Sequence, residues 1–160
     1  MSLTKLKRIA IHNYKSLRYV ELFPSQSDFT VLVGRNGAGK SSLADGFDFI
    51  KSIYQYGLEH AIARKGGYEN IAHRKERRSK GAITFEIELT LTARGKEVFP
   101  AFHTGVRFGV DDEALTFSVS HKFSFKATGQ GIRSEFQVSS ETLEVQVEKK
   151  QADLYSSNEL

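Results

Sequence analysis

A glycine-rich octapeptide constrains the fold of this chain more than any other feature of its sequence. It runs from Gly34 to Ser41 and reads Gly-Arg-Asn-Gly-Ala-Gly-Lys-Ser, a complete match to the pattern G-x-x-x-x-G-K-[S/T]. At the composition of this chain, roughly 0.01 such matches would arise by chance over all starting positions. The pattern belongs between a strand and a helix, so it predicts a strand–loop–helix unit here.

Both flanks of the octapeptide carry the periodicity that such a unit requires. Residues 29–33 (Phe-Thr-Val-Leu-Val) form a short, apolar and β-branched run, which predicts a fully buried central strand. After the loop, apolar residues recur at steps of four, three and four, at Leu43, Phe47, Ile50 and Tyr54. This period predicts a helix over residues 40–56 with that face buried, and Gly57 predicts its end.

The residue types in the loop suit the phosphates of a nucleotide. The glycines leave room for backbone N–H groups to point inward, and they tolerate positive φ. Lys40 places a positive charge on the β- and γ-phosphates, and the Ser41 hydroxyl is the predicted Mg²⁺ ligand. The positive end of the following helix points at the same anion. Lys40 is thus the catalytic candidate, and the predicted binding residues are Gly34, Arg35, Asn36, Gly37, Ala38, Gly39, Lys40, Ser41 and Ser42.

The remaining patterns predict strands and one further short helix. Residues 3–12 and 19–22 read as a strand and its return strand, and residues 58–64 as a helix. From Gly81 onward, apolar and polar residues alternate as they do in half-buried strands. The strands predicted there are residues 83–92, 98–110, 115–125, 136–138 and 143–147. The fold class is thus α/β (or α+β), with an antiparallel meander of about four or five strands in the second half.

Composition excludes several classes of protein and of site. The 160 residues suit one domain, and the chain has no cysteine, which excludes disulfides, thiolate metal sites and thiol nucleophiles. No apolar run reaches the roughly 18 residues of a membrane helix, and residues 1–10 lack the apolar stretch of a secretory signal. We therefore expect no membrane partner and a cytoplasmic location.

The net charge of +4 is concentrated in one segment. Residues 61–80 carry seven basic side chains against Glu69 and Glu76, a local charge of +5, so the rest of the chain sums to −1. A local excess of this kind binds nucleic acid or an acidic partner, or forms a solvated loop, and the pattern favours neither reading. The basic residues are Arg64, Lys65, Arg74, Lys75, Arg77, Arg78 and Lys80.

Three segments together resemble ABC-type ATPases of the RecF, SMC and OLD-like group. They are the loop core at residues 36–41, the run Ile-Ala-Ile-His-Asn-Tyr-Lys-Ser-Leu at residues 9–17, and the run Arg-Lys-Gly-Gly-Tyr-Glu-Asn-Ile at residues 64–71. The resemblance implies the N-terminal lobe of an ABC-type P-loop NTPase head. Such a lobe has a mixed sheet around the phosphate-loop helix and an antiparallel β-subdomain. The implied ligands are ATP and Mg²⁺.

The resemblance further implies a mechanism that needs a second ATPase head. In that group ATP binds between two heads, one of which offers the phosphate loop and the other a signature motif. A homodimer or a higher homo-oligomer is therefore expected. By analogy, the biological setting is DNA repair, chromosome maintenance or anti-phage defence, and DNA contact through residues 64–80 would fit it.

The elements that complete such a head do not occur in this sequence. Residues 110–113 (Val-Asp-Asp-Glu) superficially match an apolar strand ending in Asp-Glu, but they follow Arg-Phe-Gly and read as a turn. No Leu-Ser-Gly-Gly signature is present. The expected organisation is an N-terminal lobe over residues 1–160, divided into residues 1–57, 58–80 and 81–150. We expect the full protein to be an ATPase, of which this chain is an N-terminal fragment that is inactive alone.

Some residues and two other classes of function stay open. Lys15 and Ser16 either approach the nucleotide, as the resemblance implies for this turn, or form a solvated turn. Gln137 and Gln146 compete for the glutamine that touches Mg²⁺ and the attacking water in this group, and each also reads as an ordinary strand residue. A kinase or GTPase is disfavoured, because no Asn-Lys-x-Asp motif occurs and a meander after the first helix does not suit a kinase. A non-catalytic nucleotide- or DNA-binding module is the other alternative.

Overall fold

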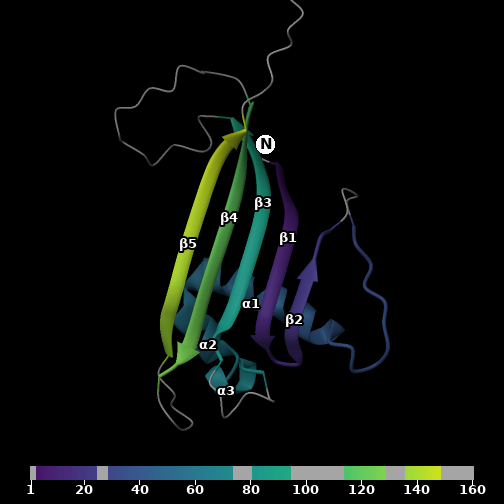
Figure 1. The fold of residues 1–160 in the computed structure, drawn as a ribbon, viewed down its shortest axis with the longest axis vertical. Helices are drawn as coiled ribbons and strands as arrows, with labels where there is room; N and C mark the ends of the chain where they lie inside the picture. Colours follow the sequence, from purple (N-terminus) through teal and green to yellow (C-terminus); the bar gives the residue numbers. More distant parts are fainter. Residues whose placement is uncertain (1–2, 25–28, 74–80, 95–113, 129–135, 149–160) are drawn as a thin grey trace, which may run out of the picture.

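An antiparallel sheet with helices on one face makes up the described part of the chain (Figure 1). The computed structural model describes residues 3–24, 29–73, 81–94, 114–128 and 136–148. Its elements, in chain order, are β1 (Leu3–Tyr14), β2 (Leu17–Leu22), α1 (Lys40–Tyr56), α2 (Leu58–Arg64), α3 (Tyr68–Ile71), β3 (Ile83–Arg94), β4 (Ala114–Ala127) and β5 (Phe136–Glu148). In the view of Figure 1 the helices lie behind the lower half of the sheet, and the strands extend beyond them.

The sheet brings distant parts of the sequence side by side. Its strand order is β2-β1-β3-β4-β5, and each neighbouring pair is antiparallel. Ile11 of β1 pairs with Phe85 of β3, which pairs with Phe123 of β4. The α/β class predicted from the sequence is confirmed. The predicted mixed sheet and separate β-subdomain are instead one continuous antiparallel sheet among the described strands, because residues 29–33 stay outside it.

Aromatic rings fill the space between the sheet and the helices. Phe85 of β3 and Phe49 of α1 are both fully buried, and their ring centroids are 5.8 Å apart. Phe123 stacks on Phe85 at 5.4 Å, and Phe125 lies 6.2 Å from Phe49. Tyr14, at the end of β1, closes the cluster 5.4 Å from Phe49. Offset and edge-on ring pairs of this kind add about 0.5–1.5 kcal/mol each beyond the burial of their area.

The buried face of α1 is rotated from the predicted one. Helix bounds at residues 40–56 are as predicted, and Leu43 and Ile50 of the predicted face are buried. Phe47 is 37% exposed, however, and Tyr54 is more exposed still, whereas Gly46 and Phe49 are buried. The reason is a close approach to β1, because a Cβ at Gly46 would lie only 3.0 Å from Ile11 Cδ1. Glycine allows this contact but contributes no apolar side chain, so the apolar period did not reveal the true face.

The predicted buried strand at residues 29–33 is wrong for this structure. These residues are not in a strand, and Val31 and Val33 are 70% and 91% exposed. A buried strand needs hydrogen-bond partners on both sides, and within the described residues the sheet ends at β2. The chain instead runs outside the β2 edge before it enters α1 (Figure 1). Apolar and β-branched composition favours a strand but does not determine whether neighbouring strands are present to pair with it.

The other predicted elements have mixed outcomes. The helix at residues 58–64 is confirmed as α2, while α3 was not predicted. The two short strands predicted at residues 136–138 and 143–147 form one strand, β5. The predicted strand at residues 98–110 and the Val-Asp-Asp-Glu turn lie outside the described residues. No helix in the described part of the chain is long and apolar enough to cross a membrane.

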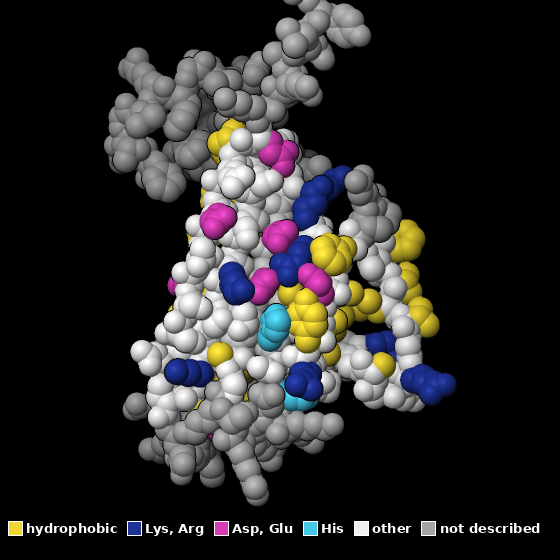
Figure 2. Space-filling model, in the orientation of Figure 1, with side chains coloured by type: hydrophobic (Ala, Val, Ile, Leu, Met, Phe, Trp, Pro, Cys, Tyr) yellow, Lys and Arg dark blue, Asp and Glu magenta, His cyan; other side chains and the backbone are white. Residues whose placement is uncertain are grey.

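Charged side chains of both signs gather on the face of the sheet that carries no helix (Figure 2). Arg8 of β1 donates hydrogen bonds to Glu21 of β2 at 2.5 Å and to Glu86 of β3 at 2.9 Å. A third bond joins Arg8 to Glu88 at 3.0 Å. Hydrogen bonds from Lys122 and from Arg8 outweigh the effect of burial and lower the pKa of Glu86. These contacts, which we call the Arg8 ladder, join Glu21, Arg8, Glu86, Glu88 and Lys122 across β2, β1, β3 and β4. Their charges let this face stay in contact with water.

We expect Phe49→Ala to destabilise the fold by about 3–5 kcal/mol, because it empties the centre of the aromatic cluster. The matched control is Phe47→Ala on the same helix, which should lose less than about 1.5 kcal/mol because its ring is already partly exposed. Denaturant unfolding of both variants measures the difference. Equal losses would contradict the helix orientation described above.

Candidate phosphate-binding site

The glycine-rich loop is an exposed turn that leads directly into α1. The amide of Ala38 donates to the carbonyl of Arg35 at 3.2 Å, which closes the turn. Gly37 and Gly39 both have positive φ, of 82° and 93°. Residues with a Cβ rarely adopt this conformation, so these two glycines give the loop its shape. Residues 34–38 are all exposed, which leaves the loop open to an incoming anion.

Lys40 folds back over the loop that precedes it. Its Nζ donates hydrogen bonds to the carbonyl oxygens of Gly34 at 2.6 Å and of Arg35 at 2.8 Å. The ammonium group is therefore held at the mouth of the loop and not in the core. A positive charge there attracts a phosphate that enters the loop, and the two carbonyl contacts are ones that the lysine can exchange for phosphate oxygens.

The N-terminus of α1 has free capacity for an anion. Its N-cap is Gly39, which makes no side-chain cap, and the first turn contains no acidic residue. The first amides of a helix have no partner within it, and the helix dipole places positive potential at the same end. The Ser41 side chain is exposed in this turn. The loop, Lys40 and the helix end thus converge on one point where phosphates and Mg²⁺ would fit.

The β1–β2 turn, residues 14–17, packs against the base of this loop. Ser16 Oγ and Ser42 Oγ are 2.7 Å apart and share a hydrogen bond. Leu17 is buried beneath Gly39, where a Cβ would lie 2.8 Å from Leu17 Cδ2. The turn that the sequence left as either a nucleotide contact or a solvated turn is therefore fixed in place. The Ser42 hydroxyl is engaged with it, which distinguishes Ser42 from Ser41.

Asp45 of α1 joins the same turn to the end of α2. Its Oδ2 accepts a hydrogen bond from Tyr14 OH at 2.6 Å and forms an ion pair with Lys15 Nζ at 2.5 Å. Its Oδ1 accepts from Lys65 at 2.7 Å, and Lys65 also bonds Asp48 at 2.8 Å. Burial raises the pKa of Asp45, but the hydrogen bonds from Lys15, Lys65 and Tyr14 outweigh it and lower the pKa to about 2. Asp45 is therefore ionised at neutral pH.

The chain after α3 holds the other side of the turn. Lys15 has a positive φ of 50°, and its amide donates to the carbonyl of Ile71 at 2.7 Å. The carbonyl of Lys15 accepts from His73 Nδ1 at 2.7 Å, which places the proton on that ring nitrogen. The sequence did not predict these contacts. Two sequence features could have indicated them, namely the Lys-Gly-Gly run before α3 and the aspartate five residues after Lys40. Neither occurs at a spacing that by itself predicts a contact.

Comparison with known proteins identifies the family of this chain. The sequence matches a family described as an AAA ATPase domain over residues 5–159. The chain belongs to the AAA ATPase domain family. It is also similar to the structural maintenance of chromosomes protein 1 of Schizosaccharomyces pombe, with 39% identity over 49 residues. That match covers 31% of this chain and 4% of the yeast protein, so the chain spans a small fraction of that relative's length.

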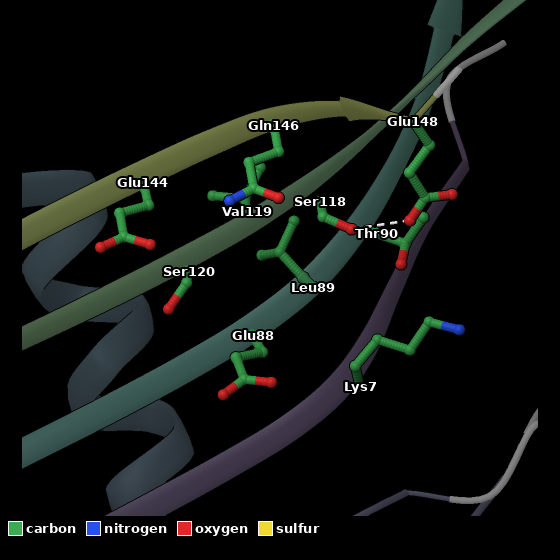
Figure 3. A pocket seen from close by; sticks show the side chains of 10 residues that line it. All are labelled: Lys7, Glu88, Leu89, Thr90, Ser118, Val119, Ser120, Glu144, Gln146 and Glu148. Atoms are coloured by element: carbon green, nitrogen blue, oxygen red, sulfur yellow. Dashed lines mark hydrogen bonds between the residues drawn. The ribbon is translucent and has the colours of Figure 1, made fainter.

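The described part of this AAA ATPase domain also has a groove on the outer face of the sheet (Figure 3). It lies over β1, β3, β4 and β5, and three of its side chains are the carboxylates Glu88, Glu144 and Glu148. One basic side chain, Lys7, borders it, and Ser118 donates to Glu148 at 2.6 Å. The excess of carboxylates repels a polyphosphate, so this groove does not suit the nucleotide.

The remaining candidates of this AAA ATPase domain do not join the loop. Gln146 lines the acidic groove on the outer face, and Gln137 pairs with Lys126 on β4. Within the described residues no group of three or more His, Asp or Glu side chains could hold a metal ion. Of the basic segment, residues 74–80 lie outside the described residues. Lys65 is paired with two aspartates, so it is not free for DNA.

Alanine substitutions at Gly37 and Gly39 should distinguish backbone strain alone from backbone strain combined with a steric clash. We expect Gly37→Ala to lower the free energy of unfolding by about 1–2 kcal/mol, because alanine is strained at a φ of 82°. The loss should stay in this range, since no atom lies within 4 Å of the added Cβ. Gly39→Ala should lose at least about 1 kcal/mol more, because its Cβ meets the buried Leu17 side chain. Denaturant unfolding tests this order. A smaller loss for Gly39→Ala would refute the packing of the turn against the loop.

Proposed function

We propose that this AAA ATPase domain binds Mg-ATP through residues 34–42. The observation that carries the proposal is the convergence of Lys40 and the uncapped N-terminus of α1 at an exposed glycine loop. The loop amides would surround the β- and γ-phosphates. Arg35 and Asn36 would contribute backbone N–H groups, and Ala38 would exchange its bond to the Arg35 carbonyl for one to a phosphate. Their side chains would stay in water, as they are in the structure.

Each polar side chain of the site then has a distinct role. Lys40 would exchange its contacts with the carbonyls of Gly34 and Arg35 for contacts with the phosphates. Ser41, exposed in the first turn, would hold Mg²⁺, and Ser42 would offer its amide because its hydroxyl already bonds Ser16. When bound, Mg²⁺ supplies positive charge that offsets the charge developing on the γ-phosphate.

Hydrolysis would require a catalytic base and a signature motif in addition to the described residues. Among the described residues, the first turn of α1 contains no acid, and Asp45 is occupied by two cations and a tyrosine. A carboxylate engaged in this way is a poor base for a water molecule. We infer that the base and the signature motif come from a second lobe and a second ATPase head, with ATP closing the two heads together. A homodimer is the simplest arrangement.

Residues 29–33 fit this incomplete state. Four of the five are large apolar residues, and all are exposed in the structure. An exposed run that is rich in apolar and β-branched residues readily pairs with another strand. We infer that this run becomes the buried strand expected from its composition when a strand of the second lobe lies beside it. The phosphate loop would then be anchored at both ends, by that strand and by α1.

The biological setting is inferred from likeness and charge together. The match to a structural maintenance of chromosomes protein supports a role in chromosome maintenance. DNA repair and anti-phage defence rest on the resemblance to the RecF, SMC and OLD-like group. The basic run over residues 64–80 supports a DNA contact, carried chiefly by its part beyond Lys65. A kinase or GTPase role has no comparable support, since no guanine-recognition motif occurs in the sequence.

Lys40→Ala should weaken Mg-ATP binding about 10- to 100-fold, because it removes a charge-assisted contact to the phosphates. The fold should be unchanged, since the lysine contacts only exposed loop carbonyls. Lys51→Ala is the control, an exposed lysine on the same helix away from the loop. Calorimetric titration with Mg-ATP measures both. Undiminished binding by Lys40→Ala would sink the proposed site.

The 160-residue chain should bind Mg-ATP without hydrolysing it at a measurable rate, because no carboxylate among the described residues is positioned as a base. Phosphate release by the purified chain, with Lys40→Ala as background, is the measurement. Turnover clearly above that background would show that a catalytic carboxylate lies within this chain.

A further inference from the structure

The β1–β2 turn has a backbone conformation that must be held from outside. Asn13 and Lys15 both have positive φ, of 57° and 50°, which is unusual for residues other than glycine. Such conformations persist where the surroundings supply compensating contacts. Here one side of the turn is held by backbone, since Lys15 bonds Ile71 and the amide of His73 donates to the carbonyl of Asn13 at 2.9 Å. The other side is held by Asp45.

Asp45 links the turn to the same helix that begins at the phosphate loop. Its carboxylate contacts the side chains of two successive turn residues, Tyr14 and Lys15. The next two turn residues, Ser16 and Leu17, contact Ser42 and Gly39 at the other end of this stretch of α1. The contacts therefore form a closed ring from α1 through the turn and back to α1. The charge of Asp45 draws the turn onto the helix.

We propose that Asp45 is a positioning residue for the phosphate loop, which it acts on through the β1–β2 turn. The inference rests on the proposed function for its consequence, nucleotide affinity, but the structural part stands on these contacts alone. Within the described residues, the hydrogen bonds and ion pairs of Asp45 go to Tyr14, Lys15 and Lys65 and not to Lys40 or the loop. With its charge removed, Lys15 and Lys65 lose their common partner, the turn loosens, and Ser16 and Leu17 no longer brace Ser42 and Gly39.

Asp48 provides a matched control on the same helix. It is also an aspartate and also bonds Lys65, at 2.8 Å. Its hydrogen bonds within the described residues do not reach the turn, and its side chain is 49% exposed. Asp45→Asn and Asp48→Asn therefore remove the same charge and the same lysine contact. They differ in whether the turn is released. Asparagine keeps an acceptor for the buried Tyr14 hydroxyl, so the fold is preserved.

The first test measures Mg-ATP affinity of the 160-residue chain by calorimetry. Asp45→Asn should bind about five- to tenfold more weakly, and Asp48→Asn should stay within about twofold of the unmodified chain. Ser16→Ala breaks the contact at the far side of the turn. Added to Asp45→Asn, it should cause little further loss, because both changes act through the same turn. Equal affinity of Asp45→Asn and Asp48→Asn, or fully additive effects of Asp45→Asn and Ser16→Ala, would overturn the proposal.

The second test needs no nucleotide, so it separates this inference from the proposed function. Amide hydrogen exchange reports the local opening of the turn at Lys15 and of the start of α1 at Leu43. Asp45→Asn should speed exchange at both amides at least about fivefold over Asp48→Asn. Unchanged exchange would overturn the positioning role. If the unmodified chain fails to bind Mg-ATP, the proposed function fails, while the exchange comparison still decides the role of Asp45.

Discussion

The close contact of α1 with β1 at Gly46 is the constraint on which the rest of the structure depends. It brings the helix axis near enough to the sheet for Phe49 to enter the ring cluster of Tyr14, Phe85 and Phe125. The same approach places Asp45 within reach of Tyr14 and Lys15, and the first turn of the helix over the β1–β2 turn. A larger residue at position 46 would lift the helix and loosen the loop with it.

The loop and the outer face of the sheet carry opposite local charge. On the helix side, the phosphate loop combines Lys40 with an uncapped helix N-terminus, so positive potential gathers where the polyphosphate would bind. On the outer side, the Arg8 ladder neutralises Glu21 and Glu86, and the carboxylates of the groove leave a local excess of negative charge. With this separation, an anion would be attracted to the loop and repelled by the groove.

Residues 65–73, after α2, connect α1, the β1–β2 turn and the start of the β3 segment. Lys65 reaches back to α1, Ile71 and His73 hold the β1–β2 turn, and the buried Tyr68 donates to the carbonyl of Gly81 at 3.2 Å. Burial raises the pKa of Tyr68 to about 12, so this hydroxyl keeps its proton as a donor. A change at residues 64–73 would therefore reach the phosphate loop without touching it.

The sequence by itself determined the features that depend on neighbouring residues alone. The loop and both bounds of α1 and α2 followed from glycine conformation and from helical periodicity, which act over a few residues. Only the tertiary structure decided which face of α1 is buried, that residues 29–33 lie outside the sheet of described strands, and that Asp45 meets Lys15 and Lys65. These outcomes depend on partners 20 or more residues away in sequence. A strand becomes buried only when its neighbours are present, and an ion cluster forms only where packing brings its members together.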